Sequence, residues 1–365
     1  MEINRHEGRF RTLWITVAGV LAGFTGAAVW AVSLAVYQPF MEPPDLPGGL
    51  TSAENGTYWP RDERQWAILL AFAGVLLIAG PRRSAVTAGG TLAAIWSGAD
   101  LWLDRVDVSG GAAAWSLGAV AAGGFAVTAG AAWWWSAGER DGELVRHLAV
   151  VGALVTALTV GVLGNDLDHD VTLPSGESVA RVPSEALSQG VAWLRGGLAV
   201  LFAAVVLALL APRLTRGRRL IAAGCAAMLV AAPFTFWFAS YVIGSDDLAA
   251  AAALVVTLVA AALLGLSARP LPVARLARAA VACLVAAPVA IVAAFVGSVL
   301  AGEAMTRIAA DPPVNAADTD ASAPVLTVLL GVGVALVGHL FARVPAATPA
   351  VSHPWPAATA PASRM

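Results

Sequence analysis

Long apolar runs alternate with short polar segments along almost the whole chain. A helix needs about 20 apolar residues to cross a bilayer core about 30 Å thick. The pattern predicts a single all-α bundle over residues 1–344, a polytopic integral membrane protein. It has about ten spans, at residues 13–37, 66–80, 84–103, 112–135, 147–164, 191–211, 220–243, 248–267, 279–300 and 324–341.

The polar segments between these runs are mostly short turns. Three are longer and rich in Pro, Asp and Ser, and we expect them to be external loops that cap the outer face: residues 38–65, 165–190 and 301–323. The end of the chain, residues 345–365, is rich in Ala and Pro. Such a composition predicts a disordered cytoplasmic tail.

Composition excludes an ordinary soluble domain. Hydrophobic residues make up 58% of the chain and charged residues 13%, whereas soluble domains carry about 25% charged residues. The lipid bilayer is therefore the predicted partner, and no nucleic-acid partner is predicted. Cys225 and Cys283 both fall within apolar runs, which is typical of small buried hydrophobic residues rather than of a disulfide or metal pair.

The distribution of arginine predicts the orientation. All the basic residues are Arg. If the N-terminus is cytoplasmic and ten helices alternate, every cytoplasmic loop receives at least two of them, and most acids fall outside. This is the positive-inside pattern. Both termini are therefore predicted in the cytoplasm, with the protein in a bacterial plasma membrane.

One stretch, "WSGADLWLDRVD" at residues 96–107, suggests a binding site. Trp96, Asp100 and Asp104 are four residues apart and share one helical face. Ionisable groups within a membrane are functional candidates by default, and Arg195 lies at similar depth as a possible partner of Asp100. With three further aromatic residues these groups would form an outward-facing pocket for a sugar, a lipid headgroup or a cation: Trp102, Trp193 and Trp237. The alternative is an ordinary interfacial aromatic belt beside acidic loops.

A second stretch, "DLDHDVTLPSGE" at residues 166–177, has the spacing of a calcium site. It resembles the EF-hand loop, with acids at its first, third, fifth and twelfth positions: Asp166, Asp168, Asp170 and Glu177. The resemblance implies calcium as a cofactor. Val171 departs from it, because the family has Gly at the sixth position. The alternative is a solvated acidic loop.

Small residues form a stripe in the first span. Gly19, Gly23 and Gly26 are spaced for close helix packing. The contact could lie inside the bundle or join the protein to a membrane partner.

Three functional classes remain open. A transporter or permease for a small or lipid-like substrate is favoured by the number of helices. The second class is a noncatalytic scaffold or subunit, and the third is an outer-leaflet enzyme acting on a lipid-linked substrate. The acidic first external loop resembles that of polyprenyl-phosphate-dependent glycosyltransferases, in which it would carry a catalytic carboxylate: Glu42, Asp45, Glu54, Asp62 and Glu63. No complete catalytic motif occurs in the chain, so we name no catalytic residue.

Overall fold

The computed structural model describes residues 3–41, 59–135, 142–161, 170–172, 178–180, 184–231, 257, 260–261, 264, 273–309 and 322–343. These residues form α1 (Ile3–Val32), the π-helix η1 (Ser33–Tyr37), α2 (Gln38–Met41), α3 (Trp59–Ala79), α4 (Arg83–Arg105), α5 (Gly111–Trp135), α6 (Gly142–Gly161), α7 (Ser184–Leu210), the 3-10 turn η2 (Ala211–Arg213), α8 (Arg216–Val230), α11 (Val273–Ala309) and α12 (Ala323–Arg343). A two-stranded antiparallel hairpin, β1 (Asp170–Thr172) and β2 (Ser178–Ala180), lies at one end.

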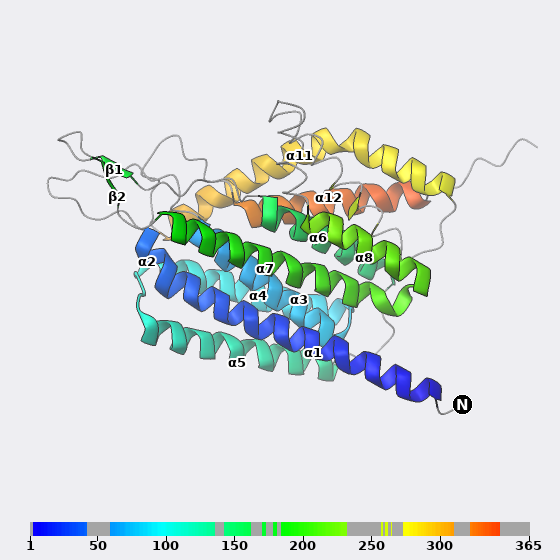
Figure 1. Ribbon diagram of the computed structural model, residues 1–365, viewed down its shortest axis with the longest axis horizontal. Helices are drawn as coiled ribbons and strands as arrows, with labels where there is room; N and C mark the ends of the chain where they lie inside the picture. The colour runs from blue at the N-terminus through cyan, green and yellow to red at the C-terminus, as the bar shows by residue number, and fades with distance from the viewer. Residues whose placement is uncertain are drawn as a thin grey trace, which may run out of the picture.

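The long helices lie side by side along the long axis of the molecule (Figure 1). Within the described residues, four stretches are long and apolar enough to cross a membrane: Leu13–Tyr37, Gly111–Trp135, Trp193–Leu210 and Val285–Ala309. The prediction of a helical membrane protein is thus supported. The number of ten spans and the orientation remain predictions, because span 248–267 and part of span 220–243 fall outside the described residues.

Several helices extend beyond the predicted spans. Residues 59–65 and 38–41, assigned above to the first external loop, are helical, and α7 and α11 likewise reach into the other two predicted loops. The sequence pattern placed the start of α3 too late because residues 61–65 are all polar. They remain helical in the fold because neighbouring helices supply partners for their side chains.

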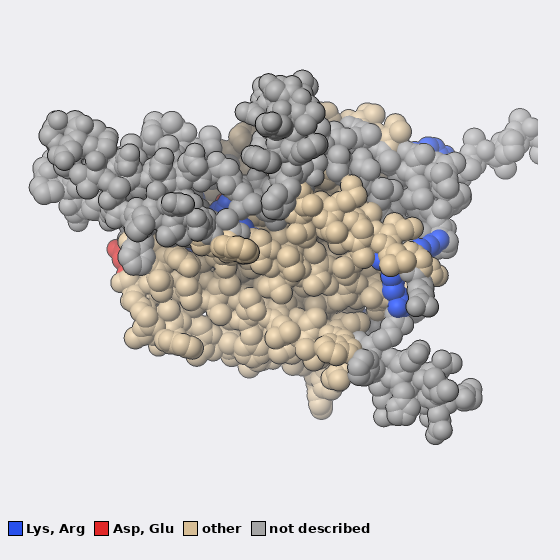
Figure 2. Space-filling view, in the orientation of Figure 1, with Lys and Arg blue, Asp and Glu red and all other residues tan. Residues whose placement is uncertain are grey.

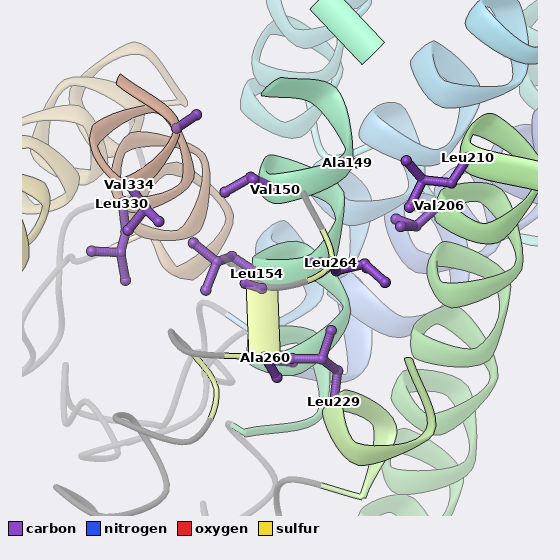
Figure 3. Packing of buried hydrophobic residues seen from close by; sticks show 14 of the residues in the cluster. Ala149, Val150, Leu154, Val206, Leu210, Leu229, Ala260, Leu264, Leu330 and Val334 are labelled. Carbon is purple, nitrogen blue, oxygen red and sulfur yellow. The ribbon is translucent and has the colours of Figure 1, made fainter. Parts of the chain in front are cut away.

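The helices form two groups, each with its own apolar core. The first group comprises α1, α3, α4 and α5, packed around buried residues such as Phe125. The second comprises α6, α7, α8, α11 and α12 (Figure 3). The boundary between the groups, here called the seam, is filled by apolar side chains such as Trp66 and Leu70 of α3 and Leu198 and Phe202 of α7. The seam is therefore largely apolar along the middle of the bundle.

Glycines allow α1 and α3 to approach closely. A Cβ atom on Gly26 would lie 2.5 Å from the carbonyl oxygen of Ala67, and one on Gly19 would lie 2.9 Å from that of Gly74. Backbone atoms cannot move aside as a side chain can. The small-residue stripe of the first predicted span is therefore used inside the bundle, which confirms one of the two interpretations of it.

The outside of the bundle is apolar along its length. Uncharged residues cover the middle of the visible face, and Arg side chains gather towards the end at which α8 begins (Figure 2). Exposed side chains on α5 and α11 include Val120, Val127, Val285, Val289 and Val292. Such a surface suits contact with lipid.

Candidate functional site

Five consecutive polar residues begin α3: Arg61, Asp62, Glu63, Arg64 and Gln65. Arg61, Glu63, Arg64 and Gln65 are buried, with exposed fractions of 3%, 0%, 0% and 8%, and Asp62 is half-buried. Successive residues of a helix point in different directions. Burial of four of these five consecutive residues therefore requires neighbours around most of the circumference of α3. We call these residues and their partners the polar hub, and the end of the bundle at which α3 begins the hub end.

Arg64 joins α3 to α4. Its Nε lies 2.7 Å from Oδ1 of Asp100 and its Nη2 lies 2.6 Å from Oδ2 of Asp104. The two aspartates are one turn apart on α4, so both can reach one planar guanidinium. Gln38 Oε1 accepts a third bond from Arg64 Nη1, at 2.8 Å, and the indole N–H of Trp30 donates to Asp100 at 2.7 Å. These contacts join α1, α3 and α4 of the first helix group with the short helix α2 that follows α1.

A π-helical turn positions Gln38 for this contact. Residues Ser33–Tyr37, at the end of the first candidate membrane span, are π-helical, and the N–H of Gln38 donates to the carbonyl of Ser33. The carbonyl of Ala35 accepts a bond of 2.8 Å from the N–H of Gly110, which has the positive φ of 101° that favours glycine. Single π-turns occur frequently at functional sites. The α4–α5 turn is thereby bonded to the π-helical turn that precedes Gln38.

The other four residues of the run contact the second helix group. Glu63 forms an ion pair with Arg195 of α7. Arg61 Nη1 donates to Thr306 Oγ1 of α11 at 2.8 Å, and Ser322, just before α12, donates to Gln65 Oε1 at 2.6 Å. The run therefore supplies polar contacts that cross the seam at the hub end.

Asp62 lies at the first turn of α12. Its carboxyl group accepts a hydrogen bond from the backbone N–H of Ala323 and interacts electrostatically with Arg195 and Arg61. A carboxylate is favourable at a helix N-terminus, where backbone N–H groups lack partners within the helix. Asp62 thus meets three elements: its own helix, α7 and α12.

Among the described residues, the charges of the hub do not balance when every group is ionised. Three guanidinium groups, those of Arg61, Arg64 and Arg195, face four carboxyl groups, those of Asp62, Glu63, Asp100 and Asp104. Burial raises the pKa of Asp62 to about 7, although Arg195 and Arg61 act to lower it. Burial also raises the pKa of Glu63, against the opposing effect of Arg195. Both residues precede the apolar stretch of α3, which begins at Trp66.

Several buried polar atoms have no hydrogen-bond partner within the described part of the chain. They include Glu63 Oε2, Asp104 Oδ1, Trp96 Nε1 and Ser33 Oγ. A buried polar atom without a partner is destabilising, and natural proteins tolerate few of them. The two carboxylate oxygens are places where a hydrogen-bond donor would be stabilised.

The structure brings together only part of the predicted outer pocket. Trp96, Asp100 and Asp104 line one face of α4, and the ring of Trp96 meets that of Trp30 edge to face with centroids 5.3 Å apart. Arg195 and Asp100 each have a different partner from the one proposed, Glu63 and Arg64 respectively.

The remaining predicted pocket residues do not join this cluster. Trp102 and Trp193 are 61% and 81% exposed on the outside of the bundle, as expected of interfacial aromatic residues. Trp237 lies outside the described residues.

Sequence reasoning missed the hub itself. Residues 61–65 were assigned to an external loop because five polar residues interrupt the apolar pattern. A signal was present: two arginines and two acids stand in immediate succession directly before an apolar helix. Of the acidic residues of the first predicted external loop, Asp62 and Glu63 belong to this hub, whereas Glu42, Asp45 and Glu54 lie outside the described residues.

The predicted calcium loop is described only in part. Asp170 begins β1, and Val171 pairs with Val179 in extended backbone rather than at a sharp turn. Asp166, Asp168 and Glu177 lie outside the described residues. Among those that are described, no cluster of three or more His, Cys, Asp or Glu could hold a metal ion. Calcium binding remains a prediction.

The comparisons with known proteins give no relative from which a role could be transferred. No protein-family model, no curated protein and no solved structure matches the chain.

Proposed function

We propose that the protein is a transporter for a small or lipid-like substrate, and that the polar hub is its outer gate. The observation that carries this proposal is the placement of the polar contacts. Those that join α3 to α7, α11 and α12 gather at the hub end, whereas the seam below them is apolar. Many transporters work by movement of one helix bundle against another around a central site.

The two kinds of contact have different consequences for movement. A hydrogen bond contributes only about 0.5–1.5 kcal/mol net, because its groups bond to water when the contact opens. Polar contacts at the water-facing end of a seam can therefore be exchanged for water. The apolar contacts below permit helices to slide over each other without leaving polar groups unpaired.

The predicted orientation places this gate on the outside. The hub end is the end at which α4 and α11 finish and α3, α7 and α12 begin, and the arginine distribution assigns that end to the outer side. In this interpretation the described conformation is closed to the outside. The scarcity of charged residues along the middle of the spans suits an uncharged or lipid-like substrate.

Transport can be tested on the full chain in proteoliposomes. A mixture of uncharged solutes (sugars, nucleosides and short-chain alcohols) is supplied outside, and the contents are identified by mass spectrometry. We expect at least one solute to enter faster than in protein-free liposomes. Glu63→Gln should change that rate several-fold, because it removes the charge that pairs with Arg195 across the seam.

The matched control is Glu303→Gln. Glu303 forms an ion pair with Arg307 on the exposed surface of α11, where loss of the pair should leave the rate unchanged. Equal rates in protein-containing and protein-free liposomes for every solute and for labelled phospholipid would contradict the proposal.

A scaffold or subunit role is the second candidate, and the surface of α5 favours it. Small residues follow one another at helical spacing on its exposed side: Ser116, Ala119, Gly123, Ala126 and Gly130. Such surfaces allow close approach of another helix. Native mass spectrometry after gentle extraction tests this role. A stoichiometric second polypeptide, released by Gly123→Leu, would favour the scaffold over the transporter.

A further inference from the structure

We propose that Asp62 is the proton-binding group of the outer gate, and that a proton received from the outer aqueous phase holds the gate closed. This inference rests on the proposed transport function. It names the ion that controls the gate and the residue that binds it.

The position of Asp62 distinguishes it from the other hub carboxyl groups. Asp100 and Asp104 each contact the guanidinium of Arg64 directly, and Glu63 contacts that of Arg195. These three residues are buried, whereas Asp62 is half-buried. Asp62 is therefore the hub carboxyl residue with the largest solvent-exposed fraction.

Asp62 also lies where the two helix groups meet. It faces Arg61 and Glu63 of its own helix, Arg195 of α7 and the N–H of Ala323 at the start of α12. The nearby part of α11 contributes the uncharged Thr306, while its charged residues Glu303 and Arg307 pair with each other on the surface. A change of charge on Asp62 therefore acts on the contact of α3 with both α7 and α12.

Charge balance supports one bound proton. Within the part of the chain that the structure describes, the hub holds three guanidinium groups and four carboxyl groups. A proton on one carboxylate makes the cluster neutral, and burial of a neutral cluster is far less unfavourable than burial of a net charge. Only proton transfer from water to a carboxylate oxygen is involved.

The direction of the effect follows from linkage. In the closed structure burial raises the pKa of Asp62 from 3.8 to about 7, and opening to water would return it towards the ordinary value. The closed state therefore binds the proton more tightly between these two pH values, and lowering the pH favours closure. Above about pH 7 the carboxyl is ionised in both states, and closure is weakest.

The experiment measures the distance between the two helix groups at the hub end. Spin labels are attached to cysteines at Gly111 of α5 and Gly190 of α7, in a Cys225→Ala, Cys283→Ala background. Both glycines are exposed, and a Cβ atom on either meets nothing within 4 Å. A second pair, at Gly130 of α5 and Gly217 of α8, reports on the opposite end and meets the same conditions.

The distance distributions are recorded for the full chain in nanodiscs from about pH 5 to about pH 9. We expect the long-distance population of the hub-end pair to grow as the pH rises, by up to about tenfold per unit below pH 7. Asp62→Asn, which mimics the protonated residue, should hold the short distance at every pH. Glu63→Gln should retain a pH-dependent distance.

Other outcomes would overturn the inference in distinguishable ways. A pH dependence that persists in Asp62→Asn, or that vanishes only in Glu63→Gln, assigns the proton elsewhere. Two distances whose relative populations do not change with pH would support a gate that opens and closes, but would exclude control of it by protons. A single distance at all pH values, unchanged also in Arg195→Met, would contradict both the inference and the transport function.

Discussion

The Nε atom of Arg64 lies 2.7 Å from Oδ1 of Asp100, and both side chains are buried between α3, α4 and α1. This pair holds together the first helix group. Ion pairs so deeply buried gain little over an apolar core of the same shape, but the loss of one partner leaves an uncompensated charge. Removal of one member of the pair therefore tests whether the hub stabilises the fold.

Arg64→Met should be strongly destabilising. It leaves Asp100 and Asp104 buried without their cation, and breaking such a pair costs about 3–5 kcal/mol. Thermal unfolding in detergent should show a much lower midpoint than for the wild type. Arg307→Met, at a pair whose Arg is 81% exposed, provides the control and should change the midpoint little. Equal effects of the two substitutions would show that the hub pair does not stabilise the fold.

Close packing of α1 on α3 should depend on the absence of a Cβ atom at Gly26. Gly26→Ala places a Cβ atom 2.5 Å from the carbonyl oxygen of Ala67, so the helices must separate. Overpacking of this kind costs about 1–3 kcal/mol. Gly123→Ala on α5, where a Cβ atom meets nothing within 4 Å, should be neutral or slightly stabilising. Thermal unfolding of the two variants side by side checks the difference.

The apolar runs predict most of the fold, because in lipid such a run can satisfy its backbone hydrogen bonds only as a helix. They placed α4 and α5 to within two residues. They failed at the start of α3 because hydropathy treats Arg61–Gln65 as solvent-exposed, although each side chain has a partner on another helix. Pairing of that kind depends on which helices are neighbours. For the same reason Asp100 was recognised as a buried acid, but its cation was not.

The stability of the protein should fall as the pH rises through neutrality, and Asp62 should account for much of the fall. Because burial raises the pKa of Asp62 to about 7, the folded chain binds a proton there more tightly than the unfolded chain does. The resulting stabilisation is lost as the pH rises through that value. The thermal midpoint should therefore decrease between about pH 5 and about pH 8 in the wild type and change less in Asp62→Asn. A difference between the two proteins that stays constant over this range would contradict the assignment.

Covalent closure of the hub end should stop transport. Ser322 donates to Gln65 at 2.6 Å across the seam, so cysteines at these two positions face each other. A cysteine is shorter than a glutamine, and a short thiol-cleavable cross-linker is therefore better suited than a direct disulfide. In a background without Cys225 and Cys283, cross-linking of Gln65→Cys/Ser322→Cys should abolish uptake of the solute identified above, and cleavage with a reducing agent should restore it.

Each single-cysteine variant treated with the same reagent should keep its uptake, which separates closure of the seam from modification of the hub. Uptake that continues in the fully cross-linked protein would show that the substrate does not pass this end of the seam, and the gate would then have to be placed elsewhere in the bundle.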